Sequence, residues 1–249
     1  MIEQLSIDLS NYCSKECPFC YNHSRRSGNT LWTPDEVIHF AGDCIAHGVK
    51  AVSLGGGEPF EYDGIFEVID ALFPQCYLSV TSNGLPLENQ DVWQSLQRHK
   101  PDKIHITIHN PDLKEETARV ESILPRIAAL DIKPGVNLLV GADKTEAARD
   151  EYSRLRKILN SDQIILVPQR FSNSPSPRQL ASVAGGKPFQ SPSCLLGCRK
   201  PDKFCSVSWD KRVNFCSFTP HKVALRSLDF RGLMDGLKDV VWSSCAHRT

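Results

Sequence analysis

Strand-like and helix-like segments alternate between residues 4 and 167, and this alternation restricts the fold more than any other feature. Short runs rich in apolar and β-branched residues occur at 4–9, 51–54, 77–81, 103–109, 136–140 and 163–167. Helix-like segments separate them, at 33–47, 65–73, 91–99, 115–130 and 145–159. Strands that alternate with helices form βαβ units around a parallel sheet.

The clearest helix signal is at residues 33–47. Thr33 can cap the helix, Pro34 suits the first helical position, and Glu36 completes a capping box. Gly48 then suits the left-handed residue that follows a helix.

The two faces of the strands differ in polarity. In the segment 103–109, Ile106 and Ile108 share one face, while His105, Thr107 and His109 share the other. Ser6, Asp8 and Ser10 share a face of the first strand in the same way. A closed eight-stranded barrel fills its interior with branched apolar side chains. We therefore expect an α/β fold, a partial (β/α)6 TIM-like barrel with a polar interior, with a doubly wound sheet as the alternative.

Composition excludes several classes of protein. The 249 residues include 29 basic and 29 acidic side chains, so no large net charge draws the chain to nucleic acid or to a membrane. No apolar run is long enough to span a bilayer, and the N-terminus has no signal-peptide pattern. We expect a cytoplasmic protein. In a reducing compartment, clustered cysteines among the ten present are better explained by metal binding than by disulfides.

The chain divides into three parts by pattern. Residues 1–171 carry the strand–helix alternation, and residues 172–193 are rich in Ser, Pro and Gly, which predicts a linker. Residues 194–249 hold a second group of cysteines and a helix-like stretch at 228–241.

Three cysteines follow the first strand in the segment CSKECPFC, at Cys13, Cys17 and Cys20. In parallel β/α folds this loop lies at the end of the sheet where active sites form. Two metal sites fit the spacing. His23 can complete a zinc site of three cysteines and one histidine. Alternatively, the cysteines bind three irons of a [4Fe–4S] cluster and leave the fourth iron open.

The loop after the second strand favours the cluster. The segment GGGEPF, residues 55–60, places consecutive glycines where the backbone can approach a ligand closely. Together with CSKECPFC, with GGEP at 56–59 and with TSNG at 81–84, the sequence resembles the radical S-adenosylmethionine (SAM) superfamily over about residues 4–170.

The resemblance implies a role for each matching residue. Cys13, Cys17 and Cys20 would bind a [4Fe–4S] cluster, whose open iron takes the methionyl group of SAM. Phe19 would lie near the adenine. Gly56, Gly57 and Glu58 would hold the methionyl amino group, and Ser82 and Asn83 would lie near the methionine or ribose. Asn137 and Val167 would complete the pocket, although the sequence departs from the family's glycine pattern at the fifth strand.

The resemblance also implies an activity. Members of this family cleave SAM reductively to form a 5′-deoxyadenosyl radical, which abstracts a hydrogen atom from a substrate. The electron comes from a reductant protein such as flavodoxin or ferredoxin. We expect Arg25 and Arg26, beside the cysteines, to be solvated surface charges or to help dock that donor.

The C-terminal cysteines resemble the auxiliary-cluster extension of SPASM/twitch-type members. The segment CSVSWDKRVNFC, 205–216, predicts a hairpin with a turn near Asp210 and Lys211, where that family usually has glycine. We expect Cys198, Cys205, Cys216 and Cys245 to bind a second iron–sulfur cluster, with Cys194 as the alternate ligand. A structural zinc site is the competing hypothesis. Cys44 and Cys76 have apolar neighbours and are expected to be core thiols.

Two further residues are candidates for contact with the substrate. His109 ends the fourth strand on its polar face, and Arg170 follows the sixth strand. The C-terminal auxiliary-cluster extension favours a peptide or protein substrate. Many peptide-modifying members capture a leader peptide with an N-terminal extension, whereas this sequence starts directly at the first expected strand, so we leave the substrate open. A glycyl-radical activating enzyme and a non-enzymatic zinc-binding protein remain alternative functions.

Overall fold

The computed structural model describes residues 1–170, 173–191, 199–219 and 221–243. The chain forms two compact units, which we describe separately. Unit 1 comprises Met1–Lys103 and Lys200–Cys245, and unit 2 begins at Ile104 and ends at Arg199 apart from the C-terminal tail. The boundaries of these compact units differ from those of the three parts expected from the sequence, 1–171, 172–193 and 194–249. That division into functional domains stays a prediction.

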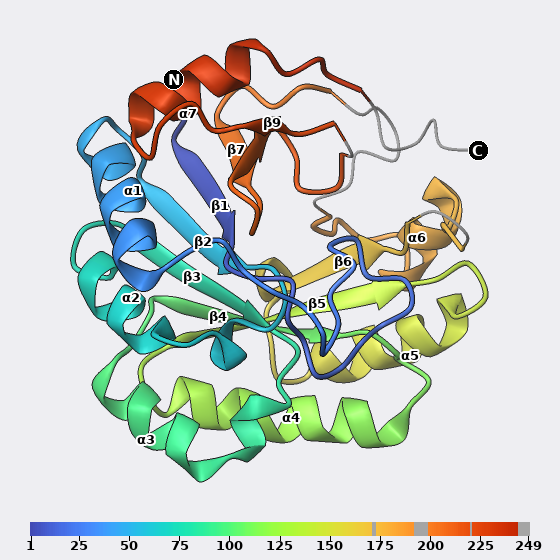
Figure 1. The fold of residues 1–249 in the computed structure, drawn as a ribbon. Helices are drawn as coiled ribbons and strands as arrows, with labels where there is room; N and C mark the ends of the chain where they lie inside the picture. The colour runs from blue at the N-terminus through green and yellow to red at the C-terminus, as the bar shows by residue number, and fades with distance from the viewer. Residues whose placement is uncertain (171–172, 192–198, 220, 244–249) are drawn as a thin grey trace. The chain divides into compact units, whose positions relative to one another are not determined.

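Unit 1 contains a mostly parallel sheet in the order β3-β2-β1-β7-β8-β9 (Figure 1). Its strands are β1 (Gln4–Asp8), β2 (Ala51–Gly55), β3 (Tyr77–Ser82), β7 (Phe204–Val207), β8 (Arg212–Asn214) and β9 (Val223–Ala224). β1 pairs in parallel with β2 on one side and with β7 on the other, whereas β8 and β9 run antiparallel to their neighbours. The C-terminal segment therefore extends the sheet that the N-terminal strands begin.

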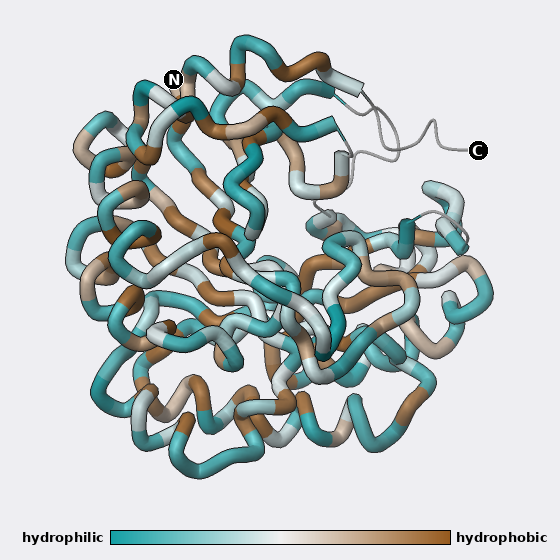
Figure 2. The backbone as a smooth tube through the Cα atoms, viewed as in Figure 1, coloured by the Kyte–Doolittle hydropathy of each residue, from teal (hydrophilic) through white to brown (hydrophobic). Residues whose placement is uncertain are grey.

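The helices of unit 1 pack on the apolar face of these strands. They are α1 (Pro34–Ala46), α2 (Ile65–Leu72), α3 (Gln90–Arg98) and α7 (Phe230–Lys238), with short 3-10 turns η1 (Pro59–Glu61) and η2 (Pro86–Glu88). Leu5, Ile7 and Leu54 are at most 1% exposed, as is Phe40 of α1. Figure 2 shows this apolar layer in brown along β1 to β3, with polar residues on the outer faces of the helices. Burial of these side chains is the main force that holds the sheet to the helices.

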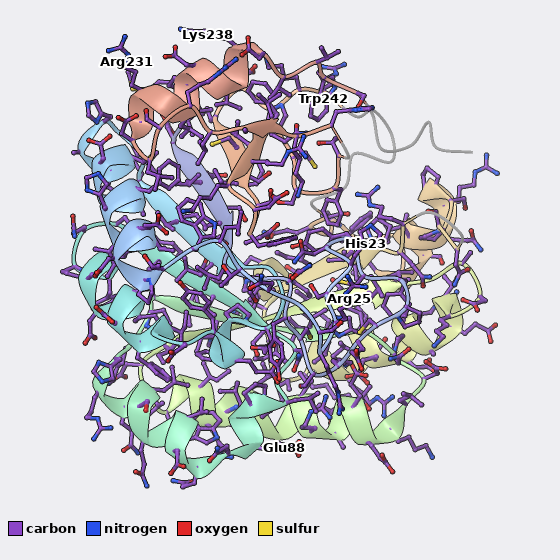
Figure 3. The ribbon with its side chains drawn as sticks, viewed as in Figure 1. His23, Arg25, Glu88, Arg231, Lys238 and Trp242 are labelled. Carbon is purple, nitrogen blue, oxygen red and sulfur yellow. The ribbon has the colours of Figure 1, made fainter. Side chains whose placement is uncertain are left out.

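The capping box predicted for α1 is present. The Oγ1 of Thr33 accepts a hydrogen bond from the backbone N–H of Glu36 at 3.3 Å, and Glu36 Oε2 accepts one from the N–H of Thr33 at 2.9 Å. At the other end of the chain, Arg231 and Lys238 of α7 point outward (Figure 3).

Unit 2 contains the strands β4 (Lys103–Ile108), β5 (Lys133–Val140) and β6 (Ile164–Pro168), in the order β6-β5-β4. Its helices are α4 (Lys114–Ala128), α5 (Thr145–Leu155) and α6 (Pro177–Val183), with the turn η3 (Ser161–Gln163). As predicted, Ile106 and Ile108 are fully buried on one face of β4, while His105 lies on the other.

The order and type of the six strands and five helices predicted up to residue 167 match the structure. Among the described residues the strands of neither unit close into a ring, which agrees with an open α/β fold. The predicted linker was wrong in one part, because residues Pro177–Val183 form α6. Ser176 and Gln179 make a capping box there, with hydrogen bonds of 3.2 and 2.9 Å. The described helices include none with the length and apolar character needed to cross a membrane.

The predicted C-terminal hairpin is formed by β7 and β8. Lys211, at the turn, has φ of +58°, the left-handed conformation for which glycine is favoured. Its Nζ lies 2.6 Å from Glu36 Oε1 of α1, so the turn is held by an ion pair with the helical layer.

Substitution at this turn separates backbone strain from the ion pair. Lys211→Gly and Lys211→Ala both remove the ion pair, but only glycine relieves the left-handed conformation. We expect Lys211→Gly to exceed Lys211→Ala in free energy of unfolding by roughly 1 kcal/mol. Urea denaturation of both variants measures the difference. Equal stabilities would show that the turn does not need the left-handed conformation in solution.

Candidate metal and cofactor site

The segment between β1 and α1, residues 9–33, folds back on itself and carries the three closely spaced cysteines. We call it the cysteine loop. The N–H of Arg25 donates to Asn11 O at 2.9 Å, and the N–H of Cys13 donates to Arg25 O at 3.1 Å. The N–H of Asn11 in turn donates to Asn29 O at 2.9 Å. These bonds close the loop at its base and leave residues 14–24 as its tip.

Cys13 lies at the base of the cysteine loop, and Cys17 and Cys20 lie in its tip. Cys13 is buried, and Cys17 and Cys20 are half-buried. The N–H of Cys20 donates to Cys17 O at 3.1 Å, and the N–H of His23 donates to Cys20 O at the same distance. His23 is exposed and has φ of +50°. Figure 3 labels His23 and Arg25 on this loop.

The loop after β2 docks directly against the cysteine loop. The N–H of Glu58 donates to Tyr12 O at 2.9 Å, and the N–H of Ser14 donates to Glu61 Oε2 at 3.0 Å. Gly57 has φ of +61°, and a Cβ at this residue would lie 2.2 Å from Tyr12 O. The absence of a side chain at Gly57 therefore lets the two loops pack closely. From the sequence, we expected the glycines to allow close approach of a ligand only.

Glu58 connects the loop after β2 with the end of β3. Its side chain is fully buried, and it accepts hydrogen bonds from the N–H groups of Phe60 at 3.1 Å and Asn83 at 2.7 Å. Burial raises the pKa of the Glu58 carboxyl to about 7, against the opposing effect of these hydrogen bonds. The predicted contact between Glu58 and a methionyl amino group stays a prediction.

Asn83 carries this connection on to the first cysteine. Its Nδ2 donates to Cys13 Sγ at 3.5 Å, while its Oδ1 accepts from the N–H of Leu85 at 2.8 Å. Burial raises the pKa of the Cys13 thiol, and the hydrogen bonds that reach its sulfur oppose this effect. Ser82 accepts from the N–H of Gly84 at 2.9 Å, so the expected cofactor residues of β3 are held in place by their own turn.

The three cysteines of the loop are thiol donors of the kind that iron–sulfur clusters use. Among the described residues, no three Cys, His, Asp or Glu side chains converge on a point that one metal ion could occupy. Cysteine thiolates serve both zinc sites and iron–sulfur clusters, and in a four-iron cluster each thiolate binds a different iron. Three thiols in one closed loop, with Asn83 donating to one sulfur, are a donor set suited to that cluster.

The other predicted residues lie in several places. Phe19 is half-buried within the cysteine loop. In unit 2, Asn137 Oδ1 lies 3.0 Å from His105 Nδ1, and His109 Nδ1 lies 3.5 Å from Glu116 Oε1. Val167 lies on β6 opposite Leu139 of β5, and Arg170 follows that strand. The roles predicted for these residues are not tested by their positions.

Two of the five C-terminal cysteines, Cys205 and Cys216, lie in the described part of the chain, and their surroundings differ. Cys194, Cys198 and Cys245 fall outside the described residues. Cys205 pairs with Leu5 in the β1–β7 register, and both side chains are at most 1% exposed on the apolar face of the sheet. Burial, together with the nearby Cys44 of α1, raises the pKa of the Cys205 thiol well above its usual value. Cys216, by contrast, follows β8. Burial raises the pKa of the Tyr21 phenol in the cysteine loop, and the nearby Asp8, Cys20 and Cys216 add to this effect.

Three residues near the site had no role assigned to them by the sequence. Asp8 is buried at the end of β1 and accepts a hydrogen bond from the Tyr21 hydroxyl at 3.1 Å. Glu61 holds the N–H of Ser14. The alternation that put Asp8 on a polar face was visible in the sequence, but the partners of Tyr21 and Glu61 are 13 and 47 residues away along the chain.

Comparison with known families and sequences gives a consistent result. The model of the radical SAM superfamily matches residues 7–141. A probable GTP 3′,8-cyclase from Methanocella arvoryzae is 31% identical over 111 residues, which cover 45% of this chain and 36% of that protein. Its counterpart from Methanocaldococcus jannaschii is 27% identical over 140 residues, covering 53% and 46%. The matched part of the chain thus spans less than half the length of these relatives.

Solved structures resemble a larger part of the chain. Streptococcus suis SuiB bound to S-adenosylmethionine gives a TM-score of 0.68 at 15% identity, over 89% of this chain and 63% of that one. Native anSMEcpe with bound AdoMet gives 0.66 at 14% identity, over 95% and 81%. At this identity the likeness concerns the fold, and it confirms the expected α/β class.

The packing at Gly57 generates a prediction about iron content. Gly57→Ala places a methyl group against the carbonyl of Tyr12, so we expect the cysteine loop to be displaced and the protein to lose iron and to unfold more easily by about 1–3 kcal/mol. Gly42→Ala is the matched control, because a Cβ at Gly42 has no neighbour within 4 Å. Iron analysis after anaerobic reconstitution and urea denaturation test both variants. If Gly57→Ala kept the iron content and stability of Gly42→Ala, the two loops would not depend on this contact.

Proposed function

Because the chain belongs to the radical SAM superfamily, we propose that it cleaves S-adenosylmethionine reductively at a [4Fe–4S] cluster held by Cys13, Cys17 and Cys20. The observation that carries this proposal is the docking of the cysteine loop against the glycine-rich loop and Asn83. The cofactor pair supplies a 5′-deoxyadenosyl radical able to abstract a hydrogen atom from a substrate.

The protein's own part is to hold the cofactors in one orientation. The docked loops fix the cysteines relative to the ends of β2 and β3, and the buried Glu58 fixes those two ends relative to each other. Such fixed placement is what brings a reactive carbon close to one C–H bond of a substrate. The matched family residues Gly56, Gly57, Glu58, Ser82 and Asn83 therefore remain our candidates for SAM contacts in unit 1.

The substrate is a second part of the proposal. We favour a peptide or protein, since auxiliary-cluster members of the family that this chain resembles modify peptides. The structure of SuiB bound to its precursor peptide SuiA shares this fold and illustrates such a substrate. The sequence relatives point instead to a nucleotide, because they are probable GTP 3′,8-cyclases. A glycyl-radical activating role, and a zinc-binding role without catalysis, are further alternatives.

The electron has to come from a reductant, and we propose a protein such as flavodoxin or ferredoxin. Arg25 and Arg26 lie on the cysteine loop and are exposed. Arg26 Nε lies 3.4 Å from Glu16 Oε2, so Arg25 is the better candidate for pairing with an acidic donor protein.

The C-terminal cysteines are the candidate ligands of a second metal site. We infer a second iron–sulfur cluster, and we revise its ligand set. Five cysteines compete for four positions, and Cys205 lies in the apolar core beside α1. This leaves Cys194, Cys198, Cys216 and Cys245 as the ligands that we favour.

The catalytic cluster is tested with a cysteine variant. We expect Cys17→Ala to abolish 5′-deoxyadenosine formation from SAM and dithionite under anaerobic conditions, because it removes one of three cluster ligands. Cys76→Ala, which removes a half-buried thiol outside the site, is the control and should retain formation. Near-control rates in Cys17→Ala would refute the ligand assignment, and the absence of 5′-deoxyadenosine from the wild type would count against reductive cleavage.

The second cluster is tested with a pair of variants. We expect about eight irons in wild-type and Cys205→Ala protein and about four in Cys216→Ala protein, from two four-iron clusters. Iron, sulfide and zinc analysis on the reconstituted proteins measures this. A loss in Cys205→Ala equal to that in Cys216→Ala would restore Cys205 as a ligand. About four irons in all three proteins would refute the second cluster, and a bound zinc in its place would favour the structural zinc site.

A further inference from the structure

The face of the unit 1 sheet that is turned away from the helices carries a row of hydroxyl groups. The register pairs Ser6 with Ser53 and with Ser206, and it pairs Ser53 with Ser79. Four neighbouring strands therefore present serine at one level, about 4.8 Å apart from strand to strand. We call this face the polar face. Among the described residues of β1, β2, β3 and β7, it bears no lysine or arginine.

Asp8 lies on the same face, two residues beyond Ser6. It is 1% exposed, and its Oδ1 accepts the hydrogen bond from the Tyr21 hydroxyl at 3.1 Å. Its Oδ2 is buried and accepts no hydrogen bond from any described residue. Buried carboxylate oxygens are almost always paired, so an unpaired one calls for a partner that is absent from the chain itself.

Neighbouring residues hold the Asp8 side chain in place on two sides. On one side, Gly56 packs so closely that a Cβ there would lie 2.2 Å from Asp8 Cβ. On the other side, the Tyr21 ring packs against Phe218 with centroids 4.9 Å apart. Gly55, next to Asp8 in the register, bears no side chain, and a Cβ there would meet only Asp8 Oδ1, at 3.9 Å. The carboxylate is therefore oriented before any ligand arrives.

The charged side chains near Asp8 leave its Oδ2 atom without a hydrogen bond. Lys222 and Asp210 act on its carboxyl through space with opposite sign, and neither donates to Oδ2. A carboxylate accepts hydrogen bonds and repels phosphate, while a buried carboxylate is stabilised by a cation that also donates hydrogen bonds. The complementary group is thus an ammonium, amidinium or guanidinium group.

We propose that Asp8 binds a cationic nitrogen group of the substrate, while the serine row takes up the neutral polar part of the same molecule. This inference rests on the proposed function, since the substrate meant is the molecule that loses a hydrogen atom. It favours a substrate with a lysine-like or arginine-like group, because the buried Oδ2 of Asp8 lacks a hydrogen-bond donor among the described residues and a cationic donor stabilises a buried carboxylate.

The proposal is tested by measuring how tightly the protein binds small molecules that differ in charge. N-acetyl-L-arginine amide and N-acetyl-L-lysine amide are compared with N-acetyl-L-glutamine amide and GTP by ligand-observed NMR on the cluster-loaded protein with SAM. Wild-type protein should bind at least one cationic amide about tenfold more tightly than the neutral amide, and Asp8→Asn should lose about tenfold of that affinity. Asp63→Asn, which removes an exposed carboxyl from the loop after η1, should bind as the wild type does.

Several results would overturn the proposal. These are equal binding of cationic and neutral amides, no binding of either cationic amide, tighter binding of GTP, or unchanged binding in Asp8→Asn. Weaker SAM binding in Asp8→Asn would assign the carboxylate to the methionyl ammonium of SAM instead of the substrate.

Melting temperatures test whether Asp8 has a purely structural role. Asparagine has nearly the size of aspartate and needs no cation, so Asp8→Asn should melt no lower than the wild type. A marked fall in melting temperature, repeated in Asp8→Ser, would show that the carboxyl serves the fold. Because binding is measured apart from catalysis, a wild type that binds cationic amides but forms no 5′-deoxyadenosine would refute the proposed function and leave the Asp8 site standing.

Discussion

The candidate site depends on one fully buried carboxylate. Glu58 accepts hydrogen bonds from Phe60 and from Asn83, and its own N–H donates to Tyr12 O of the cysteine loop. Three segments that follow three different strands are thereby joined at one residue. Burial of a carboxylate is costly, and it is tolerated here because backbone N–H groups pair with both of its oxygens.

This connection explains why the neighbouring positions are glycine. A side chain at Gly56 would overlap Asp8 at the end of β1, and one at Gly57 would overlap Tyr12 of the cysteine loop. Both glycines also have positive φ, which other residues adopt at a cost. The cysteines are thus placed by backbone contacts between loops as much as by the strand that precedes them. Asn83, which donates to Cys13 Sγ, extends the same network to a sulfur.

Local patterns predicted most of the fold. The capping box at Thr33 and Glu36 and the alternation in β4 are properties of short segments, and both are present in the structure. The helix α6 was missed because serine and proline dominate its surroundings, although Ser176 and Gln179 form a capping box. The cysteine triplet left two kinds of metal site open, and the resemblance to the family depended on reading it together with GGGEPF at 55–60 and TSNG at 81–84. The position of Cys205 could not be predicted in this way, because it depends on the pairing of β7 with β1, about 200 residues apart in sequence.

The central claim is that the cysteine loop holds a cluster that binds SAM. The most direct measurement is electron paramagnetic resonance of the reduced protein with and without SAM, on a variant in which Cys194, Cys198, Cys216 and Cys245 are replaced by alanine. The account predicts the signal of one reduced four-iron cluster, with g values that change when SAM is added. No iron–sulfur signal, or a signal that SAM leaves unchanged, would contradict it.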